Sequence, residues 1–151
     1  MPGPAGVSGR TGKGGIKGAT MQGHCHCGAV SWSNSGDVAW CCYCHCEDCR
    51  RNCAAPVAAF FGMPHAAHRW TGKPPRTYRS SDKVERLFCP DCGTPMAYCH
   101  ADDRVNIHLY VCTLDRPETL QPAFHVHTCD QLPWFDTRDD LPRRFRYGNE
   151  E

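Results

Sequence analysis

Cys25-His26-Cys27 and Cys89-Pro90-Asp91-Cys92 lie 61 residues apart in the chain and supply four thiols in two close pairs. Four such ligands complete a tetrahedral zinc site, and a C-x-x-C pair bends around the ion as a knuckle. Because the two pairs come from distant segments, one ion would close a long loop and couple metal binding to folding. We therefore expect a structural zinc on Cys25, Cys27, Cys89 and Cys92.

A second cluster, Cys44-His45-Cys46-Glu47-Asp48-Cys49, sets three thiols at C-x-C-x-x-C spacing. Three protein ligands leave one coordination position of zinc open, which is the arrangement of catalytic sites. A helix that starts after the triplet would direct backbone N–H groups towards the thiolates. We therefore expect a catalytic zinc on Cys44, Cys46 and Cys49.

The thirteen cysteines are better explained by metal binding and packing than by disulfides. Their number is odd, and Met1-Pro2-Gly3-Pro4-Ala5-Gly6 lacks the apolar core of a signal peptide. We therefore expect a cytoplasmic protein with reduced thiols. The cysteines outside the two clusters are expected to pack as small hydrophobes. They are Cys41, Cys42, Cys53, Cys99, Cys112 and Cys129.

Length and composition predict a single domain. The chain has 151 residues, of which 40% are apolar, so it can bury one modest core that a structural metal would stabilise. The Gly-rich residues 1–19 carry three cations and no acid, and we expect them to be disordered. A zinc-binding β domain is predicted at 20–145, followed by a C-terminal tail at 146–151.

Charge and hydropathy argue against two classes of partner. The chain after its basic start is slightly acidic, which gives no electrostatic footprint for nucleic acid. No apolar run approaches the ~20 residues that cross a bilayer. We expect a small-molecule substrate, with neither nucleic acid nor a membrane as partner. The oligomeric state is left open, a homodimer included.

Short strands separated by turns dominate the predicted domain. Residues 105–111 alternate apolar and polar side chains with a β-branched bias, which predicts a strand with Asn106 and His108 on one face. Further strands are predicted at 29–33 and 38–41 as one hairpin, and at 77–80 and 86–88 as another. Helix is predicted only from Glu47 towards Ala59, where Pro56 limits it to a short piece. The fold class is therefore mostly β, with zinc knuckles joining the sheets.

Two other zinc patterns fit the sequence less well. His45-Cys46-Glu47 followed by Cys89-x-x-Cys92 is similar to the zinc deaminase signature, but here Pro90 follows the first cysteine instead of preceding it. A zinc ribbon from Cys46-x-x-Cys49 and Cys89-x-x-Cys92 would have ~15–20 residues between the pairs. Here 39 residues separate them. Both patterns leave the first cysteine pair without a role.

Three motifs occur in a fixed order: Gly23-His24-Cys25-His26-Cys27-Gly28-Ala29-Val30, then Cys44-His45-Cys46-Glu47-Asp48-Cys49-Arg50-Arg51, then Ser80-Ser81 with Arg86-Leu87-Phe88-Cys89-Pro90-Asp91-Cys92-Gly93-Thr94. In order and spacing they resemble the glutathione-dependent formaldehyde-activating enzyme family, which includes centromere protein V. The similarity continues at Leu114-Asp115, Pro122, His125, Pro133-Trp134 and Leu141-Pro142, so that it spans residues 21–143.

The resemblance implies a tent-like fold, similar to that of the Mss4 nucleotide-exchange chaperones, with small antiparallel sheets joined by zinc knuckles. It implies a structural zinc on the four-cysteine set and a more labile zinc on the triplet. The family's name-giving member is a carbon–sulfur lyase that joins glutathione to formaldehyde, so glutathione is implied as a co-substrate. One departure is Ala54, which stands where these proteins often have glycine, and Cys53 precedes it.

Zinc held by three thiolates supports two kinds of reaction. It deprotonates an incoming thiol, which then adds to an aldehyde, or it holds a water that attacks an imine-like C=N carbon or a C=O carbon. Three thiolates donate much charge and weaken zinc as a Lewis acid, which favours thiol handling over hydrolysis. A non-catalytic zinc-binding interaction module is the third interpretation.

Substrate contacts are predicted from charge and chemistry. Glutathione carries two carboxylates, which guanidinium groups bind in a bidentate fork. The candidate clamps are Arg50, Arg51, Arg79 and Arg86. His125 and His127 titrate near neutrality and are candidate proton shuttles. Trp134 is a candidate wall of the pocket.

Overall fold

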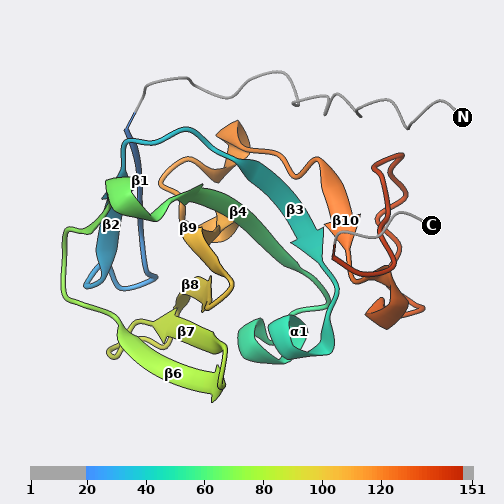
Figure 1. Ribbon diagram of the computed structural model, residues 1–151, viewed down its shortest axis with the longest axis horizontal. Helices are drawn as coiled ribbons and strands as arrows, with labels where there is room; N and C mark the ends of the chain where they lie inside the picture. Colours follow the sequence, from blue (N-terminus) through green and yellow to red (C-terminus); the bar gives the residue numbers. More distant parts are fainter. Residues whose placement is uncertain (1–19, 148–151) are drawn as a thin grey trace, which may run out of the picture.

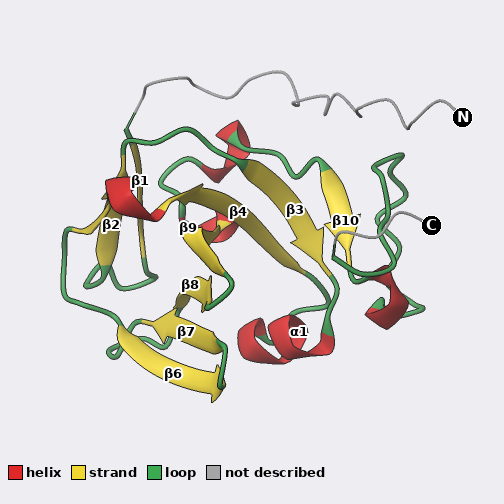
Figure 2. Cartoon of the chain, viewed as in Figure 1, coloured by secondary structure: helices red, strands yellow, loops and turns green. Residues whose placement is uncertain are grey.

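The computed structural model describes residues 20–147, so the predicted tail at 1–19 and residues 148–151 of the predicted C-terminal tail lie outside the described residues. Ten strands in two sheets dominate this region, with one α-helix and four short 3-10 helices among its residues (Figure 2). The predicted mostly β fold class is confirmed. No helix between residues 20 and 147 is long and apolar enough to cross a membrane.

The smaller sheet has three antiparallel strands in the order β1-β2-β5. Its strands are β1 (Met21–His24), β2 (Ser31–Asn34) and β5 (His68–Trp70). It lies to one side of the larger sheet (Figure 1). The strand β1 was not predicted, because its Met21-Gln22-Gly23-His24 lacks the β-branched bias of a typical strand.

The larger sheet has seven strands in the order β10-β3-β4-β9-β8-β7-β6. Its strands are β3 (Trp40–Cys44), β4 (Ala58–Pro64), β6 (Arg76–Ser81), β7 (Val84–Phe88), β8 (Pro95–His100), β9 (Asp103–Tyr110) and β10 (Phe124–Val126). All its neighbours are antiparallel except β10, which runs parallel to β3. The 3-10 helices occupy His65–Ala67, Val111–Thr113, Pro117–Thr119 and Thr128–Asp130.

The two faces of the larger sheet pack into two different clusters. Side chains alternate between faces along a strand, so Phe61 and Leu109 point towards the smaller sheet, where Phe61 contacts Trp32 of β2 with ring centroids 6.1 Å apart. Their neighbours Phe60 and Tyr110 point to the opposite face, where their ring centroids lie 4.4 Å apart. The first face builds the main core, and the second carries the triplet.

The helix α1 (Glu47–Cys53) starts directly after β3 and lies beside the ends of β3 and β4 (Figure 1). Its N-cap is Cys46, and its C-cap Ala54 adopts a left-handed conformation with φ 50° and ψ 41°. The helix predicted towards Ala59 therefore ends before Pro56, and β4 begins at Ala58. A strand was missed there because its apolar residues form a continuous run without alternation.

The predicted strand at 105–111 is confirmed as β9, and the hairpin at 77–88 is confirmed as β6 and β7. The hairpin predicted from 29–33 and 38–41 is wrong, because β2 and β3 belong to different sheets. Between them the Asn34 side chain accepts a hydrogen bond from Gly36 N at 2.8 Å and donates one to Pro64 O at 3.0 Å. These bonds hold the segment as a crossover between the sheets.

Candidate metal centres and cavity

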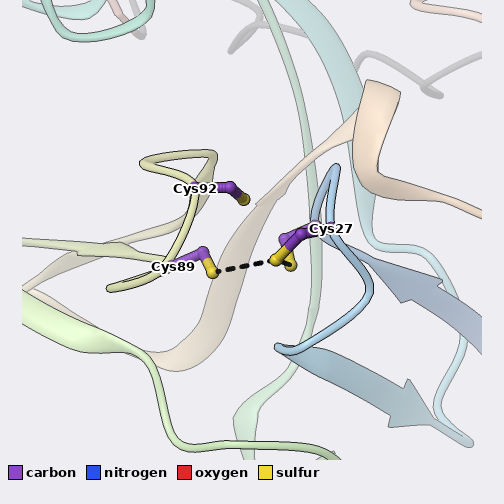
Figure 3. Close-up of side chains that lie close together, drawn as sticks. Cys27, Cys89 and Cys92 are labelled. Atoms are coloured by element: carbon purple, nitrogen blue, oxygen red, sulfur yellow. Dashed lines mark hydrogen bonds between the residues drawn. The ribbon is translucent and has the colours of Figure 1, made fainter.

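The four cysteines of the two close pairs lie together in the structure, although the pairs come from two distant segments of the chain. The sulfurs of Cys25, Cys27, Cys89 and Cys92 all lie within 4.8 Å of one another. Figure 3 shows Cys27 facing Cys89 and Cys92 from the opposite loop. The Cys27 and Cys89 sulfurs are 3.8 Å apart, and those of Cys25 and Cys27 are 3.5 Å apart.

Backbone turns of the same kind shape the two loops of this cluster. Each turn has a glycine directly after its second cysteine, with φ 78° at Gly28 and 75° at Gly93, a conformation that glycine adopts without a Cβ penalty. Thr94 joins the loops, because its hydroxyl accepts from the His26 backbone N–H at 3.1 Å. Its hydroxyl also lies 3.1 Å from the Cys92 sulfur and, with the Thr94 backbone, lowers the pKa of that thiol to about 5.

The triplet is placed by a strand end and a helix start. Cys44 ends β3, Cys46 caps α1 and Cys49 lies in its first turn, and their sulfurs all lie within 4.8 Å of one another. The Cys49 backbone N–H donates to the Cys46 sulfur at 3.3 Å. The helix start thus directs a backbone N–H towards the triplet, as the sequence predicts.

Negative charge concentrates on one sulfur of the triplet. Hydrogen bonds from the thiols of Cys44 and Cys49 lower the pKa of Cys46 to about 2. The hydrogen bonds with Cys46 and Cys49 raise the pKa of Cys44. A cluster that already stabilises a thiolate is suited to bind a metal, because the thiolate is the ligand form of cysteine.

Arg86 of β7 reaches the triplet from the side opposite α1. It is 5% exposed, and its Nη1 lies 3.8 Å from the Cys49 sulfur. Its Nε donates to the Ser80 hydroxyl at 3.2 Å, and the guanidinium lies 5.3 Å from the centroid of the Tyr98 ring. No carboxylate in residues 20–147 pairs with it, and a metal-bound thiolate at Cys49 would supply its counter-charge.

Both clusters fit zinc by their chemistry. Zinc–sulfur bonds of ~2.3 Å in a tetrahedron place neighbouring sulfurs about 3.8 Å apart, which matches the Cys27–Cys89 separation. Three thiolates on Zn²⁺ would carry a net charge of about −1, which the buried Arg86 would balance. The four-cysteine set would hold a closed structural site and the triplet an open one.

The triplet lies on the wall of a cavity with a volume of about 990 Å³. The floor of the cavity is the sheet face that carries Phe60 and Tyr98, and α1 contributes Asp48, Arg51 and Asn52. Pockets of 300–1,000 Å³ are typical of sites for drug-sized ligands. The triplet is therefore open to a small molecule.

Several predicted substrate contacts lie away from this cavity. Arg50 donates from Nε to His45 O at 2.9 Å and from Nη2 to Asp130 O at 3.2 Å. The exposed Arg79 pairs with Glu85 at 3.4 Å, and Trp134 is 71% exposed on a surface loop. None of these three arginine and tryptophan side chains is among the cavity-lining residues.

Other predicted residues are close to the triplet. Arg51, Arg86 and His127 line the cavity. His125 is fully buried behind the triplet, where it hydrogen-bonds to His45. The Cys53 thiol donates to Cys49 O at 3.0 Å, in agreement with the expectation that it is a packed thiol.

The structure adds residues that the sequence interpretation missed. Asp103 and His108 line the cavity together with Trp40, and Asp139 reaches His125 from the C-terminal segment. The alternation of residues 105–111 already placed His108 on a common face with Asn106, but nothing local indicated a cavity there. All thirteen cysteines lie within the described residues, and none forms a disulfide.

A family model described as glutathione-dependent formaldehyde-activating enzyme matches residues 20–130, which contain both cysteine clusters. A curated protein of Schizosaccharomyces pombe, described as an uncharacterized lyase, is 30% identical over 86 residues, or 55% of this chain. The chain matches about 60% of the length of that relative.

A crystal structure of a Rhodobacter sphaeroides protein has a similar fold. The TM-score is 0.50 with 24% sequence identity, and the match covers 63% of this chain and 88% of that protein. This similarity supports the arrangement of strands and shows nothing about the reaction.

Proposed function

The chain belongs to the glutathione-dependent formaldehyde-activating enzyme family, and from this premise we propose that it is a zinc-dependent carbon–sulfur lyase. Its substrate would be the adduct of a glutathione-like thiol with formaldehyde or another small aldehyde. The relative named as a lyase supports the reaction class. The observation that carries the proposal is the triplet of Cys44, Cys46 and Cys49, open to a cavity and opposed by a buried arginine.

The residues around the triplet are suited to bind a thiolate. Zinc on the three cysteines would supply an open coordination position at which a thiol is deprotonated. The guanidinium of Arg86 lies against the cluster and stabilises negative charge there, which a preorganised cation does without reorientation. Phe60 and Tyr98 form the floor of the cavity beside it.

In the lyase direction the carbon–sulfur bond of the adduct breaks and sulfur leaves with the electron pair. The hydroxyl of the adduct loses its proton as the aldehyde carbonyl forms. His127 lines the same cavity as the triplet. We therefore assign His127 as the group that accepts the hydroxyl proton, and returns it in the reverse direction.

An exchange assay tests the reaction. Nuclear magnetic resonance measures the rate at which glutathione and formaldehyde interconvert with S-hydroxymethylglutathione, and we expect the zinc-loaded protein to raise this rate above the uncatalysed one. Cys46→Ser and Cys49→Ser should abolish the increase. Cys53→Ser is the matched control on the same helix, because its thiol hydrogen-bonds only to backbone carbonyls, which a hydroxyl can replace. Equal rates with and without protein would contradict the proposal.

Thiol binding separates the lyase from the imine hydrolase. Calorimetric titration should show that glutathione binds about tenfold more tightly than β-mercaptoethanol, because its carboxylates can bind the cavity-lining Arg51. Arg51→Ala should remove most of this preference, whereas Arg79→Ala, remote from the cavity, should keep it. Equal affinities for the two thiols would contradict a glutathione site and favour the hydrolase.

A further inference from the structure

The cavity has a second polar end at the start of β3, away from the triplet. Trp40, Gly62 and His108 form a row across β3, β4 and β9, because Trp40 pairs with Gly62 and Gly62 with His108. Cys44 stands four residues further along β3, a distance of about 13 Å at the rise of a strand. Trp40 and His108 line the same cavity as the triplet.

His108 is held in one orientation at this end. Its Nε2 lies 2.8 Å from Oδ2 of Asp103, and Asp103 in turn accepts from the backbone N–H of Asn106 at 3.0 Å. The ring stacks on Tyr98 with centroids 5.3 Å apart and meets the edge of Trp40 at 4.7 Å and 87°. These contacts fix both the plane and the rotation of the imidazole.

Gly62 makes this arrangement sterically feasible. A Cβ at this position would lie 2.5 Å from the Trp40 indole, so only glycine lets that ring cross β4 to reach His108. Glycine at position 62 thus leaves free the space that the Trp40 indole occupies.

The bond to Asp103 determines which nitrogen of His108 carries the proton. The Asp103 carboxylate accepts hydrogen bonds, so Nε2 carries the proton and Nδ1 has a free lone pair. Within residues 20–147 no group hydrogen-bonds to Nδ1. Burial lowers the pKa of His108, against the opposing effect of Asp103, which keeps the ring neutral near pH 7. A neutral, oriented imidazole is an acceptor for a ligand hydroxyl.

The space between the triplet and His108 has an aromatic floor. Phe60 contacts Tyr110 and Tyr98 with ring centroids 4.4 and 6.1 Å apart, and all of these rings lie on the cavity face of the sheet. Tilted aromatic rings of this kind bind a further aromatic ring by edge-to-face or offset contacts. Glutathione itself offers carboxylates and an ammonium group, which match the charged side chains of α1 better than this floor.

We propose that the cavity selects thiol adducts of hydroxylated aromatic aldehydes, with the aromatic ring on the Phe60–Tyr98 floor and the hydroxyl donating to Nδ1 of His108. Binding of the sulfur of such an adduct at the triplet rests on the proposed function, whereas binding of its aromatic ring does not. Trp40, Asp103 and Gly62 act as positioning residues for His108. Formaldehyde would leave this end of the cavity without a ligand group.

The test uses two probes without sulfur, 4-hydroxybenzyl alcohol and benzyl alcohol, titrated into the zinc-loaded full chain and followed by nuclear magnetic resonance. The hydroxyl should raise affinity roughly three- to tenfold, as one neutral hydrogen bond does, and shift the ¹⁵N resonance of His108 Nδ1. His108→Leu should bind both probes equally. His65→Leu, a change at an exposed histidine outside the cavity lining, should keep the preference.

Equal affinities of the two probes for the unaltered protein would overturn the proposal, and this measurement needs no variant. A preference that survives His108→Leu would overturn it as well. The thioethers S-methylglutathione and S-(4-hydroxybenzyl)glutathione separate this inference from the proposed function. Failure of both thioethers to bind, with the phenol preference intact, would contradict the glutathione site and support the aromatic subsite.

Discussion

The imidazoles of His45 and His125 are joined by a hydrogen bond, with Nε2 of His45 2.8 Å from Nδ1 of His125, and both rings are fully buried. Nε2 of His125 continues to the Asp139 carboxylate at 3.1 Å. Because the carboxylate only accepts, the protons are aligned along the series, so His125 donates to Asp139 and His45 donates to His125. His45 stands between two cysteines of the triplet, so this series connects the proposed zinc site to the C-terminal segment.

Asp139→Asn should weaken metal binding at the triplet by up to about tenfold, because groups that orient a metal site through hydrogen bonds affect its affinity on this scale. The amide can either accept from His125 through its oxygen or donate to it through its nitrogen, so the hydrogen bonds lose their fixed direction. Competition with a chromophoric chelator measures the affinity. Asp136→Asn is the control in the same segment, since its exposed carboxylate contacts Arg138, whose backbone N–H donates to it at 2.9 Å, and has no bond to a histidine within residues 20–147. Identical affinities in both variants would contradict the role of Asp139.

Cys89→Ser should prevent folding, whereas Cys46→Ser should remove a ligand of the triplet and leave the fold intact. The first variant breaks the cluster that joins two distant loops, so we expect loss of the cooperative thermal transition. The second variant opens the triplet and should keep the circular dichroism spectrum. Metal analysis after mild chelation should leave about one zinc in the unaltered protein, from the closed site. Retention of a folded state by Cys89→Ser would refute the structural assignment.

The local parts of this structure follow from its sequence. The spacing of ligands within a motif is a local property of the sequence. The structure brings together the four thiols of the two close pairs and, in a second group, the three thiols of the triplet. The strand at β9 follows from strict alternation, and the β6–β7 hairpin from a polar turn between two β-rich runs. The positions of these elements depend on contacts within a few residues.

The non-local parts do not follow from the sequence. β2 pairs with β1 and β5 rather than with β3, and the Asn34–Pro64 bond beside it joins residues that lie far apart in the chain. The Asp139–His125–His45 series and the row of Trp40, Gly62 and His108 likewise combine residues from separate elements. Register and sheet membership decide such neighbours, and a single sequence does not encode them in any local pattern.

Ala54→Gly should stabilise the protein by about 0.5–1 kcal/mol. Ala54 ends α1 with φ 50°, a conformation that carries a Cβ penalty for alanine and none for glycine. Urea unfolding measures the change in free energy. Ala55→Gly is the control, because the neighbouring residue is not in the left-handed region and glycine there only adds chain entropy. A lower free energy of unfolding for Ala54→Gly would contradict the backbone strain assigned to alanine at this helix end.

His68 is a buried imidazole between two tryptophans. It is 7% exposed, its ring centroid lies 4.7 Å from that of Trp70 and 5.9 Å from that of Trp32, and neither ring nitrogen has a hydrogen-bond partner among the described residues. Burial, with smaller contributions from the charges of His65 and Arg69, lowers the pKa of His68 to about 4. Folding therefore favours the neutral ring.

His68→Leu should make the protein less sensitive to acid. An unfolded histidine takes up a proton near pH 6.5, whereas the folded one does so only near pH 4, so stability is full above pH 6.5 and is lost as the pH falls towards 4. The variant lacks this loss, so its stability relative to that of the unaltered protein should increase by roughly 3 kcal/mol as the pH falls across that window. Urea unfolding at several pH values measures it, and His100→Leu, a variant of a partly exposed histidine, should follow the unaltered protein. Parallel curves for His68→Leu and the unaltered protein would show that the imidazole is hydrated or paired in solution.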